Sequence, residues 1–437
     1  MKKTLFLFTF LIAVLSVDAH SNEKIPLQHF FCDSAMTSGS LSPDGKYFAS
    51  MVPASGAKCA IEEIDDPQAA RVLLVIDLET NKPTVLSGTK GKSRLTGFTW
   101  ISNTRIAFFR QPEAGLDAYS MWAINVDGTK PKELVPGKWE DSYPTGARLL
   151  DRMKDDENHI LVSYNKRRPK YTDVYKLNIF SGKLTMVAKD PVIDGQTSLG
   201  WAVDQQGLVR GYVAVKGLYT YLYHRNDADS DFELLRKFKF QEASFGPAAY
   251  SYDPRYVYMR GQAVAADGTV IDDSDTDALW LYDAYEDKFV EKIYENDRYD
   301  VGGIAISSKT EEPAYIAYYG EKPEKIWIDE DLEQVYATIE ASFPNDQVSI
   351  GGWTEDEDKA IITTWSDTNP GEMYYYDRNK GTIAFIAKSR PWINKDEMSP
   401  MLPISFTARD GLVVNGYLTV PKNLSLIHIS EPTRPQC

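Results

Sequence analysis

Histidine and cysteine are scarce in this chain, and their scarcity limits the chemistry that it can perform. The 437 residues contain five histidines and three cysteines. The sequence has no HExxH motif and no pair of closely spaced cysteines, the usual patterns of a zinc site. It also has no glycine-rich phosphate loop. We therefore predict neither a metal nor a nucleotide cofactor.

The nucleophile motif of a serine hydrolase is missing as well. Such an enzyme needs a Ser on a tight turn flanked by glycines, a His that takes its proton and a carboxylate that orients the His. No Gly-x-Ser-x-Gly is present. The nearest approaches, Gly39-Ser40 and Gly195 to Ser198, lack the spacing, and we expect both in loops. We identify no catalytic residue in this chain.

The histidines also lack a catalytic setting. His20 and His29 lie near the start of the chain, whereas His159 and His224 fall in strand-like runs, where we expect hydrogen-bonded structural roles. His428 belongs to the last fourteen residues, which read LSLIHISEPTRPQC.

Two acidic runs raise the question of a calcium loop. Counted from Asp273, the sixth and twelfth positions are Ala278 and Ala284, where an EF-hand needs Gly and Glu. We interpret Asp272 to Asp277 as a solvated turn, and Glu355 to Asp358 as a turn that connects repeats. No metal ligand is predicted.

The chain has fewer basic than acidic residues, which gives a net charge of −15 and a pI near 4.9. This balance argues against a nucleic-acid partner, because phosphate binding needs clustered Lys and Arg. The 26 tyrosines and nine tryptophans favour strands over helices.

The first nineteen residues have the pattern of a secretory signal peptide. Lys2-Lys3 precede an apolar run from Leu5 to Leu15, and Val17 and Ala19 are small residues before a cleavage site. The run is shorter than the roughly 18 residues that a spanning helix needs, and no later segment is apolar enough to cross a bilayer. We expect a periplasmic or secreted protein.

The cysteines are Cys32, Cys59 and Cys437. In an oxidising compartment a disulfide between Cys32 and Cys59 is favoured if Cys437 is not native. Two buried thiols are the alternative.

A unit of about fifty residues recurs along the chain, and each copy opens with a turn followed by an apolar run. The seven openings begin at Ser42, Trp100, Asp156, Trp201, Tyr252, Ser307 and Trp353. Most copies continue with an aromatic or β-branched strand and a polar turn, beginning at Leu74, Trp122, Val174, Tyr221, Leu279, Ile326 and Met373.

Such a period of short strands is typical of a β-propeller, whose blades are four-stranded antiparallel sheets around a central channel. We predict an all-β fold, a seven-bladed β-propeller over residues 20–395; six and eight blades are the nearest alternatives. The Trp and Tyr residues that lead the repeats are expected to pack between blades.

A β-hairpin is predicted after the repeats. In Pro403 to Asn423, apolar residues alternate up to Arg409, Asp410-Gly411 forms the turn, and Leu412 to Val420 is a second strand. The sequence SFTARDG, followed by GYLTVP, resembles the start of the α/β-hydrolase domain in the prolyl oligopeptidase family of serine peptidases. The connector Lys388 to Met401 resembles that family's run into the same hairpin.

The resemblance implies a peptidase, in the acylaminoacyl or dipeptidyl peptidase-like branch, that acts on short peptides. In that family the Ser, His and acid follow the hairpin at a distance, but in this chain fourteen residues follow Asn423. Those residues resemble a translated sequencing adapter. We expect a signal peptide at 1–19, the propeller at 20–395, the connector and hairpin at 396–423 and a non-native tail at 424–437, in a chain that is inactive by itself.

Two other classes of function remain open from the sequence. One is a non-catalytic periplasmic propeller that binds or scaffolds, as TolB-like propellers do; the hairpin counts against it, because no blade needs it. The other is a propeller enzyme with its site in the channel, for which the sequence shows no convergent His or Arg cluster.

Overall fold

The computed structural model describes residues 25–54, 56, 59, 71–88, 93–111, 118–140, 143–191, 195–240, 242–272 and 274–422. The predicted signal peptide, His20, Asp273 and the last fourteen residues, with His428 and Cys437, lie outside these ranges.

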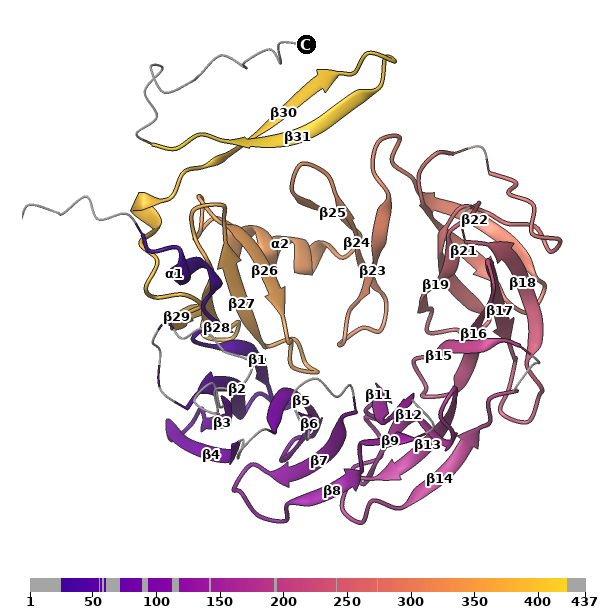
Figure 1. Ribbon diagram of the computed structural model, residues 1–437, viewed down its shortest axis with the longest axis horizontal. Helices are drawn as coiled ribbons and strands as arrows, with labels where there is room; N and C mark the ends of the chain where they lie inside the picture. Colours follow the sequence, from indigo (N-terminus) through magenta and orange to yellow (C-terminus); the bar gives the residue numbers. More distant parts are fainter. Residues whose placement is uncertain are drawn as a thin grey trace, which may run out of the picture.

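Seven antiparallel sheets follow one another along the chain and stand radially around a central opening (Figure 1). Blade 1 holds β1 (Thr37–Leu41), β2 (Tyr47–Pro53), β3 (Arg71–Asp77) and β4 (Lys82–Gly88), and blade 2 holds β5 (Arg94–Ser102), β6 (Arg105–Gln111), β7 (Ser120–Asn125) and β8 (Lys132–Val135). Blade 3 holds β11 (Ala147–Asp151), β12 (His159–Arg168), β13 (Tyr171–Asn178) and β14 (Leu184–Ala188), and blade 4 holds β15 (Thr197–Val203), β16 (Val209–Lys216), β17 (Tyr219–His224) and β18 (Glu233–Lys239).

The remaining blades complete the ring. Blade 5 holds β19 (Phe245–Tyr250), β20 (Tyr256–Gly261), β21 (Ala278–Asp283) and β22 (Lys288–Tyr294); blade 6 holds β23 (Val301–Ile306), β24 (Pro313–Tyr319) and β25 (Pro323–Trp327); blade 7 holds β26 (Gln347–Gly351), β27 (Lys359–Trp365), β28 (Glu372–Asp377) and β29 (Thr382–Lys388). Between blades 2 and 3 lies a small hairpin of β9 (Lys138–Glu140) and β10 (Tyr143–Thr145). The predicted seven-bladed propeller is confirmed.

Blade 6 departs from the expected four strands. After β25 the chain forms α2 (Glu330–Glu340) instead of a strand. The Asp329 carboxylate accepts hydrogen bonds from the backbone N–H groups of Asp331 and Leu332, so it caps the helix. Leu332, Val335, Tyr336 and Ile339 are buried on one face of α2. The strand and polar turn predicted from Ile326 onward are therefore wrong beyond β25, because the acidic run begins a helix.

The two sequence signatures correspond to turns at one end of the ring, in every blade for the first signature and in every blade except blade 6 for the second. The seven openings are the turns between first and second strands, as at Ser42 to Lys46 between β1 and β2. The second signature ends at the turn between third and fourth strands, where an Asp or Asn side chain accepts backbone N–H groups. Asp77 binds the N–H of Thr80 at 2.9 Å, and Asn178 binds that of Ser181 at 2.8 Å.

The hydrophobic core lies between the blades. Each of the seven interfaces between neighbouring blades has its own buried apolar cluster. Repeat-leading tryptophans bridge these interfaces as predicted, because Trp100 donates to the carbonyl oxygen of Ser40 in blade 1 (3.3 Å) and Trp201 to that of Thr172 in blade 3 (2.9 Å). Stacking of neighbouring faces buries both sides of each sheet.

The ring closes between blades 7 and 1 by packing and loop contacts. All four strands of blade 7 come from one continuous stretch of chain, so the first and last blades exchange no strand. The buried cluster at this closure is small and consists of Leu41, Phe48 and Ile361. The backbone N–H of Ala35 donates to the carbonyl oxygen of Ser389 at 2.8 Å.

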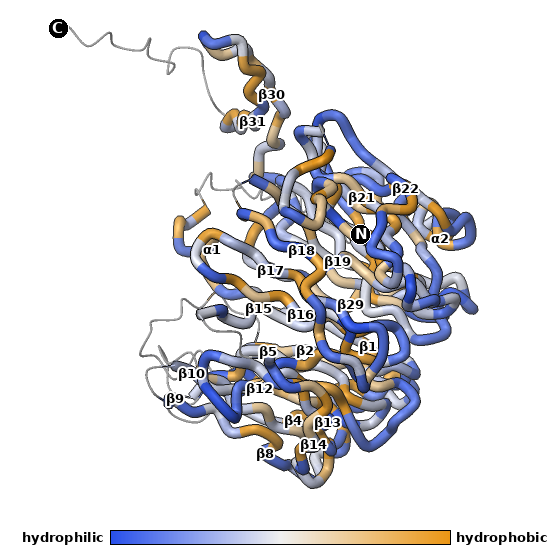
Figure 2. Tube along the Cα trace, turned by 90° about the vertical axis from the view of Figure 1, so that its right-hand side faces the viewer, coloured by the Kyte–Doolittle hydropathy of each residue, from blue (hydrophilic) through white to orange (hydrophobic). Residues whose placement is uncertain are grey.

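The predicted hairpin forms after the connector, which contains a short 3-10 turn (Lys395–Glu397). It consists of β30 (Met401–Thr407) and β31 (Val413–Thr419), paired from Met401 with Thr419 to Thr407 with Val413. Figures 1 and 2 show it standing clear of the ring. No helix among the described residues is long and apolar enough to cross a membrane.

Candidate functional site

One end of the central channel holds a cavity lined by polar and charged side chains. The volume of this cavity is about 610 Å³, and its walls are the turns between first and second strands of blades 3, 4, 6 and 7 and the end of β19. In each blade this turn lies opposite the end at which the fourth strand leaves. The cavity is therefore at the opposite end of the ring from the connector and the hairpin.

Charged and amide side chains join loops of different blades across this cavity. Lys154 in blade 3 forms an ion pair with Glu311 in blade 6. Arg152 lies 3.8 Å from the Glu355 carboxylate in blade 7. The Gln205 side-chain amide donates to the backbone carbonyl oxygens of Tyr250 (2.9 Å) and Glu311 (3.1 Å). These contacts tie five blades together at this end of the channel.

His159 lies beside the cavity but has no free ring nitrogen. Its Nδ1 is 2.9 Å from the Asp156 carboxylate, and its Nε2 is 3.3 Å from the Asn178 side-chain amide. Asp156 also accepts from Lys176 at 2.6 Å, and Lys176 together with His159 holds the pKa of the Asp156 carboxyl far below its usual range. With both nitrogens engaged, His159 has no position left for a substrate proton.

His224 is buried between blades 4 and 5. Its ring stacks on that of Tyr250, and its Nδ1 lies 3.5 Å from the Tyr250 hydroxyl. Nε2 has no hydrogen-bond partner among the described residues. Burial, reinforced by the positive charge of Arg210, lowers the pKa of His224 to about 4. The ring is therefore neutral at pH 7 and enclosed by protein.

The acidic run of blade 5 lies in the connection between β20 and β21. The prediction of a solvated turn is wrong at both ends of this run, because Asp277 is buried and the Asp272 carboxylate is 5% exposed. Lys292 binds the Asp272 carboxylate at 3.1 Å and that of Glu295 at 3.0 Å. Among the described residues no group of three or more His, Cys, Asp or Glu side chains is placed to hold a metal ion.

Three sequence-based placements need correction. Gly39-Ser40 lies within strand β1, and Ser198 lies within β15, whereas Gly195 stands in the turn before β15 as predicted. Gly39 lies where the register of β1 against β2 shifts. The run Glu355 to Asp358 is the first turn of blade 7 itself, between β26 and β27, and does not connect two blades.

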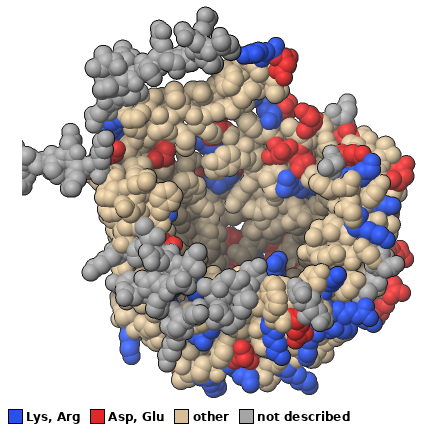
Figure 3. Space-filling view, viewed as in Figure 1, with Lys and Arg blue, Asp and Glu red and all other residues tan. Residues whose placement is uncertain are grey.

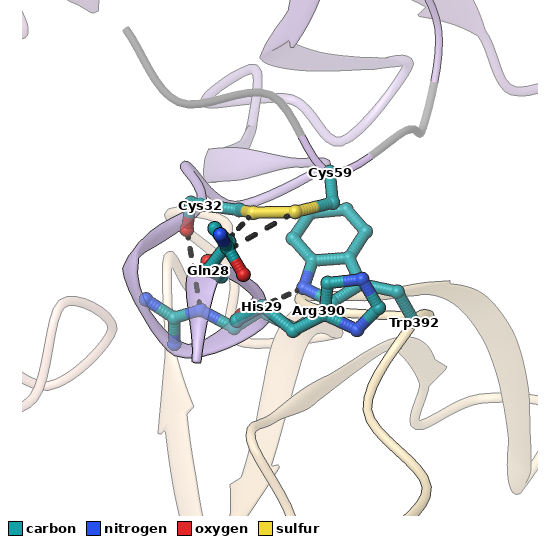
Figure 4. Close-up of a disulfide and its surroundings, with 6 residues drawn as sticks. All are labelled: Gln28, His29, Cys32, Cys59, Arg390 and Trp392. Atoms are coloured by element: carbon teal, nitrogen blue, oxygen red, sulfur yellow. Dashed lines mark hydrogen bonds between the residues drawn. A yellow bond between two sulfur atoms is a disulfide. The ribbon is translucent and has the colours of Figure 1, made fainter. Parts of the chain in front are cut away.

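A disulfide joins the segment before blade 1 to the connection between β2 and β3 of the same blade, at the connector end of the channel (Figure 4). Cys32 and Cys59 are bonded, with their Cα atoms 5.2 Å apart. Cys32 follows α1 (Gln28–Phe31), whose residue His29 accepts a hydrogen bond from Trp392 through its backbone oxygen at 2.9 Å. Arg390 donates to the Cys32 carbonyl oxygen at 3.4 Å. Trp392 thus anchors the connector to the start of the chain.

The hairpin has one apolar face that packs against nothing described. Cross-strand pairing places Leu402 opposite Leu418 and Phe406 opposite Val414 on this face, with Ile404 between them. Phe406 is 56% exposed and Leu402 50%. The opposite face is turned to the propeller, where the Tyr417 hydroxyl donates to the Glu321 carbonyl oxygen at 2.8 Å.

The charged contacts across the channel were missed by sequence reasoning. Arg152, Lys154, Gln205 and Glu311 stand in turns that the repeat marks correctly, but they meet only because the ring closes. A usable signal was present: in a propeller, all turns between first and second strands share one end of the channel.

Two curated proteins match the sequence over most of its length, whereas no family model matches it. Dipeptidyl aminopeptidase BIII of Pseudoxanthomonas mexicana is 24% identical over 403 residues, which are 88% of this chain and 51% of that protein. Dipeptidyl peptidase family member 6 of Caenorhabditis elegans is 20% identical over 432 residues, 96% of this chain and 55% of that protein. The chain spans about half the length of these curated relatives.

Solved structures share the fold. A chain from a study of two prolyl endopeptidases matches with a TM-score of 0.57 at 16% identity, over 91% of this chain and 55% of that one. Prolyl oligopeptidase B of Galerina marginata matches with a TM-score of 0.54 at 11% identity, over 91% and 57%. The resemblance to peptidases of the prolyl oligopeptidase type, predicted from the hairpin and the repeats, is confirmed.

Proposed function

We propose that this chain is the N-terminal propeller of a secreted or periplasmic serine peptidase of the prolyl oligopeptidase family, in its acylaminoacyl or dipeptidyl peptidase-like branch. The substrates are short peptides, and the reaction is acyl transfer to water through a Ser-His-Asp triad. The names of the sequence relatives support a peptidase. The propeller that this chain shares with solved prolyl endopeptidases supports the same assignment.

The hairpin is the observation that carries the proposal. Its apolar face, formed by Leu402, Ile404, Phe406 and Leu418, lies open to water, whereas every blade face is packed. A hairpin of two strands is marginal by itself and needs a further strand or a covering layer. A following α/β-hydrolase domain supplies both, since the hairpin then forms the first two strands of its sheet.

The chemistry of the proposed enzyme resides in that second domain. A Ser attacks the peptide carbonyl, a His acts first as base and then as acid, and backbone amides stabilise the oxyanion. The propeller covers the site and restricts entry to short peptides. In this division of labour residues 20–395 contribute no catalytic group and no cofactor site, and the chain alone cleaves nothing.

The proposal also assigns the two ends of the chain. Residues 1–19 are removed as a signal peptide on export, and residues 424–437 are not part of the native protein. Residues 396–423 are the connector and the first hairpin of the second domain. A TolB-like binding propeller, the alternative, has no use for an exposed apolar hairpin.

Labelling with a fluorophosphonate probe tests this assignment. The longer product of the genomic locus and the 437-residue chain are compared, with a Ser→Ala variant of the longer product's Gly-x-Ser-x-Gly serine as control. We expect labelling and hydrolysis of peptide p-nitroanilides by the longer product only. Active-site labelling of the 437-residue chain, or an inert longer product, would refute the proposal.

A further inference from the structure

A basic turn stands at the end of the ring from which the connector leaves. Residues 165–170, with the sequence NKRRPK, are the end of β12 and the two-residue turn that leads into β13 in blade 3. This turn links a second to a third strand, so it lies at the opposite end from the 610 Å³ cavity. Next to it is the β9–β10 hairpin, which Figure 2 shows on the same side of the molecule as α1.

Asn165 fixes these two segments to each other. Its side-chain amide donates to the carbonyl oxygens of Pro144 and Pro169, both at 2.8 Å, and its side-chain oxygen accepts the backbone N–H of Gly146 at 3.0 Å. The side chain is buried, and its three bonds reach both the β9–β10 hairpin and the basic turn. The turn is therefore held in one position by a satisfied polar contact.

Three of the four cations in the turn form no ion pair with a described carboxylate. The fourth, Arg167, forms a bidentate ion pair with the buried Asp173 carboxylate, with hydrogen bonds of 2.7 and 2.9 Å. Lys166, Arg168 and Lys170 are exposed, and none forms an ion pair with a described carboxylate. Lys170 extends over the Tyr143 ring, 5.0 Å from its centroid.

The described residues of the neighbouring hairpin add one cation and one acid to the surroundings of the turn. Lys138 is exposed on β9, and Glu140 is the described acid of that hairpin. Figure 3 looks onto this end of the ring and shows Lys and Arg side chains gathered along its lower right, where blades 3 and 4 lie. With a net charge of −15 overall, such a cluster creates a local attraction for anions on a molecule that repels them elsewhere.

We propose that Lys166, Arg168 and Lys170, with the Tyr143 ring, form a binding site for the carboxylates of acidic peptides. An ammonium and a guanidinium on a fixed turn suit carboxylates, and the half-exposed Tyr143 offers an apolar surface to the peptide chain. A long polyanion such as nucleic acid, or an anionic membrane, would meet the acidic remainder of the surface, whereas a short peptide contacts the turn alone.

The biological meaning of this site rests on the proposed function. The connector leaves the ring at this end, so in the longer peptidase the site faces the second domain and biases the enzyme toward acidic peptides. Binding itself needs no hydrolysis and is measured on the propeller chain. A longer product that fails to cleave peptides would therefore remove the proposed function without touching this measurement.

The test compares two hexapeptides by fluorescence anisotropy, each with the same uncharged dye, one with three Glu and the other with Gln in their place. The variant K166Q/R168Q/K170Q is compared with K132Q/K183Q/K309Q, which removes the same charge from exposed lysines at the opposite end of the ring. All six side chains are exposed, and Asn165 and Arg167 stay in place, so both variants are expected to keep the fold; circular dichroism checks this.

The expected result is tighter binding of the Glu peptide, weakened about tenfold in the first variant and less than twofold in the second. Binding should also weaken as salt is raised from low to physiological strength. Equal affinity for the two peptides, or equal loss in the two variants, would overturn the proposal. So would binding to anionic phospholipid vesicles in the absence of peptide binding.

Discussion

Trp392 donates its indole N–H to the backbone carbonyl oxygen of His29 over 2.9 Å, and this bond joins the exit of the seventh blade to the entry of the first. Among the described strands, none is exchanged between the first and last blades. The closure of the ring therefore depends on contacts of this kind and on the cluster around Phe48. The Cys32–Cys59 disulfide holds the entry segment, which carries His29, to blade 1.

Trp392→Phe is expected to lower the free energy of unfolding by about 1 kcal/mol, because it leaves the His29 carbonyl without this donor and keeps most of the apolar contact. Urea denaturation followed by circular dichroism measures the change. Trp139→Phe is the matched control, since Trp139 is 50% exposed and should change stability by less than about 0.5 kcal/mol. Equal effects in both variants would mean that the Trp392 bond contributes nothing to closure.

Loss of the disulfide should cost more. The bridge closes a loop with a sequence separation of 27 residues, so its removal by Cys32→Ser with Cys59→Ser is expected to cost about 3 kcal/mol. Oxidation itself is checked by alkylation and mass spectrometry in a Cys437→Ser chain. No thiol should react before reduction and two should react afterwards; two reactive thiols in the untreated protein would contradict the bridge.

Acid should destabilise the fold through His224. The pKa of the native imidazole is about 4 and that of the unfolded state about 6.5, so between these values the unfolded chain binds more protons. The contribution of His224 is complete above pH 6.5 and falls as the pH drops toward 4, by at most about 3 kcal/mol. His224→Phe should flatten this part of the stability profile.

The control for that profile is His29→Gln, which removes a partly exposed histidine and leaves the buried surroundings of His224 intact. The measurement is the urea midpoint at a series of pH values from 4 to 7.5. An unchanged slope in the His224→Phe chain would show that other groups carry the acid sensitivity.

The apolar face of the hairpin should drive self-association of the 437-residue chain. Phe406→Lys places a charge on that face, and Ser405→Lys places one on the opposite face. Size-exclusion chromatography over a concentration series is expected to show less association for Phe406→Lys only. A wild-type chain that stays monomeric throughout would contradict this expectation.

Periodicity in the sequence was sufficient to predict the ring. The turns that begin at Ser42, Asp156 and Ser307 lie between first and second strands, and the tryptophans at 100 and 201 bridge blades. These features follow from local turn chemistry and from apolar patterning, which a repeat displays many times over.

Features that depend on ring closure were harder to predict from the sequence. The pair of Lys154 with Glu311 joins positions 157 residues apart, and no local pattern couples them. Helix α2 had a readable signal in the Asp329 cap and the spacing of Leu332, Tyr336 and Ile339, but the expectation of a fourth strand outweighed it. Gly39 and Ser198 were expected in loops, but both belong to strands: Ser198 pairs with Ala214, and Gly39 lies at an irregularity in the pairing of β1 with β2.

The most direct test of the account is a long sequencing read of the genomic locus across the codon for Asn423. We predict that the frame continues into a Gly-x-Ser-x-Gly elbow followed by an Asp and a His, and that the last fourteen residues of this chain are absent from the gene. An authentic stop codon directly after Cys437 would contradict the peptidase assignment and leave a binding propeller in its place.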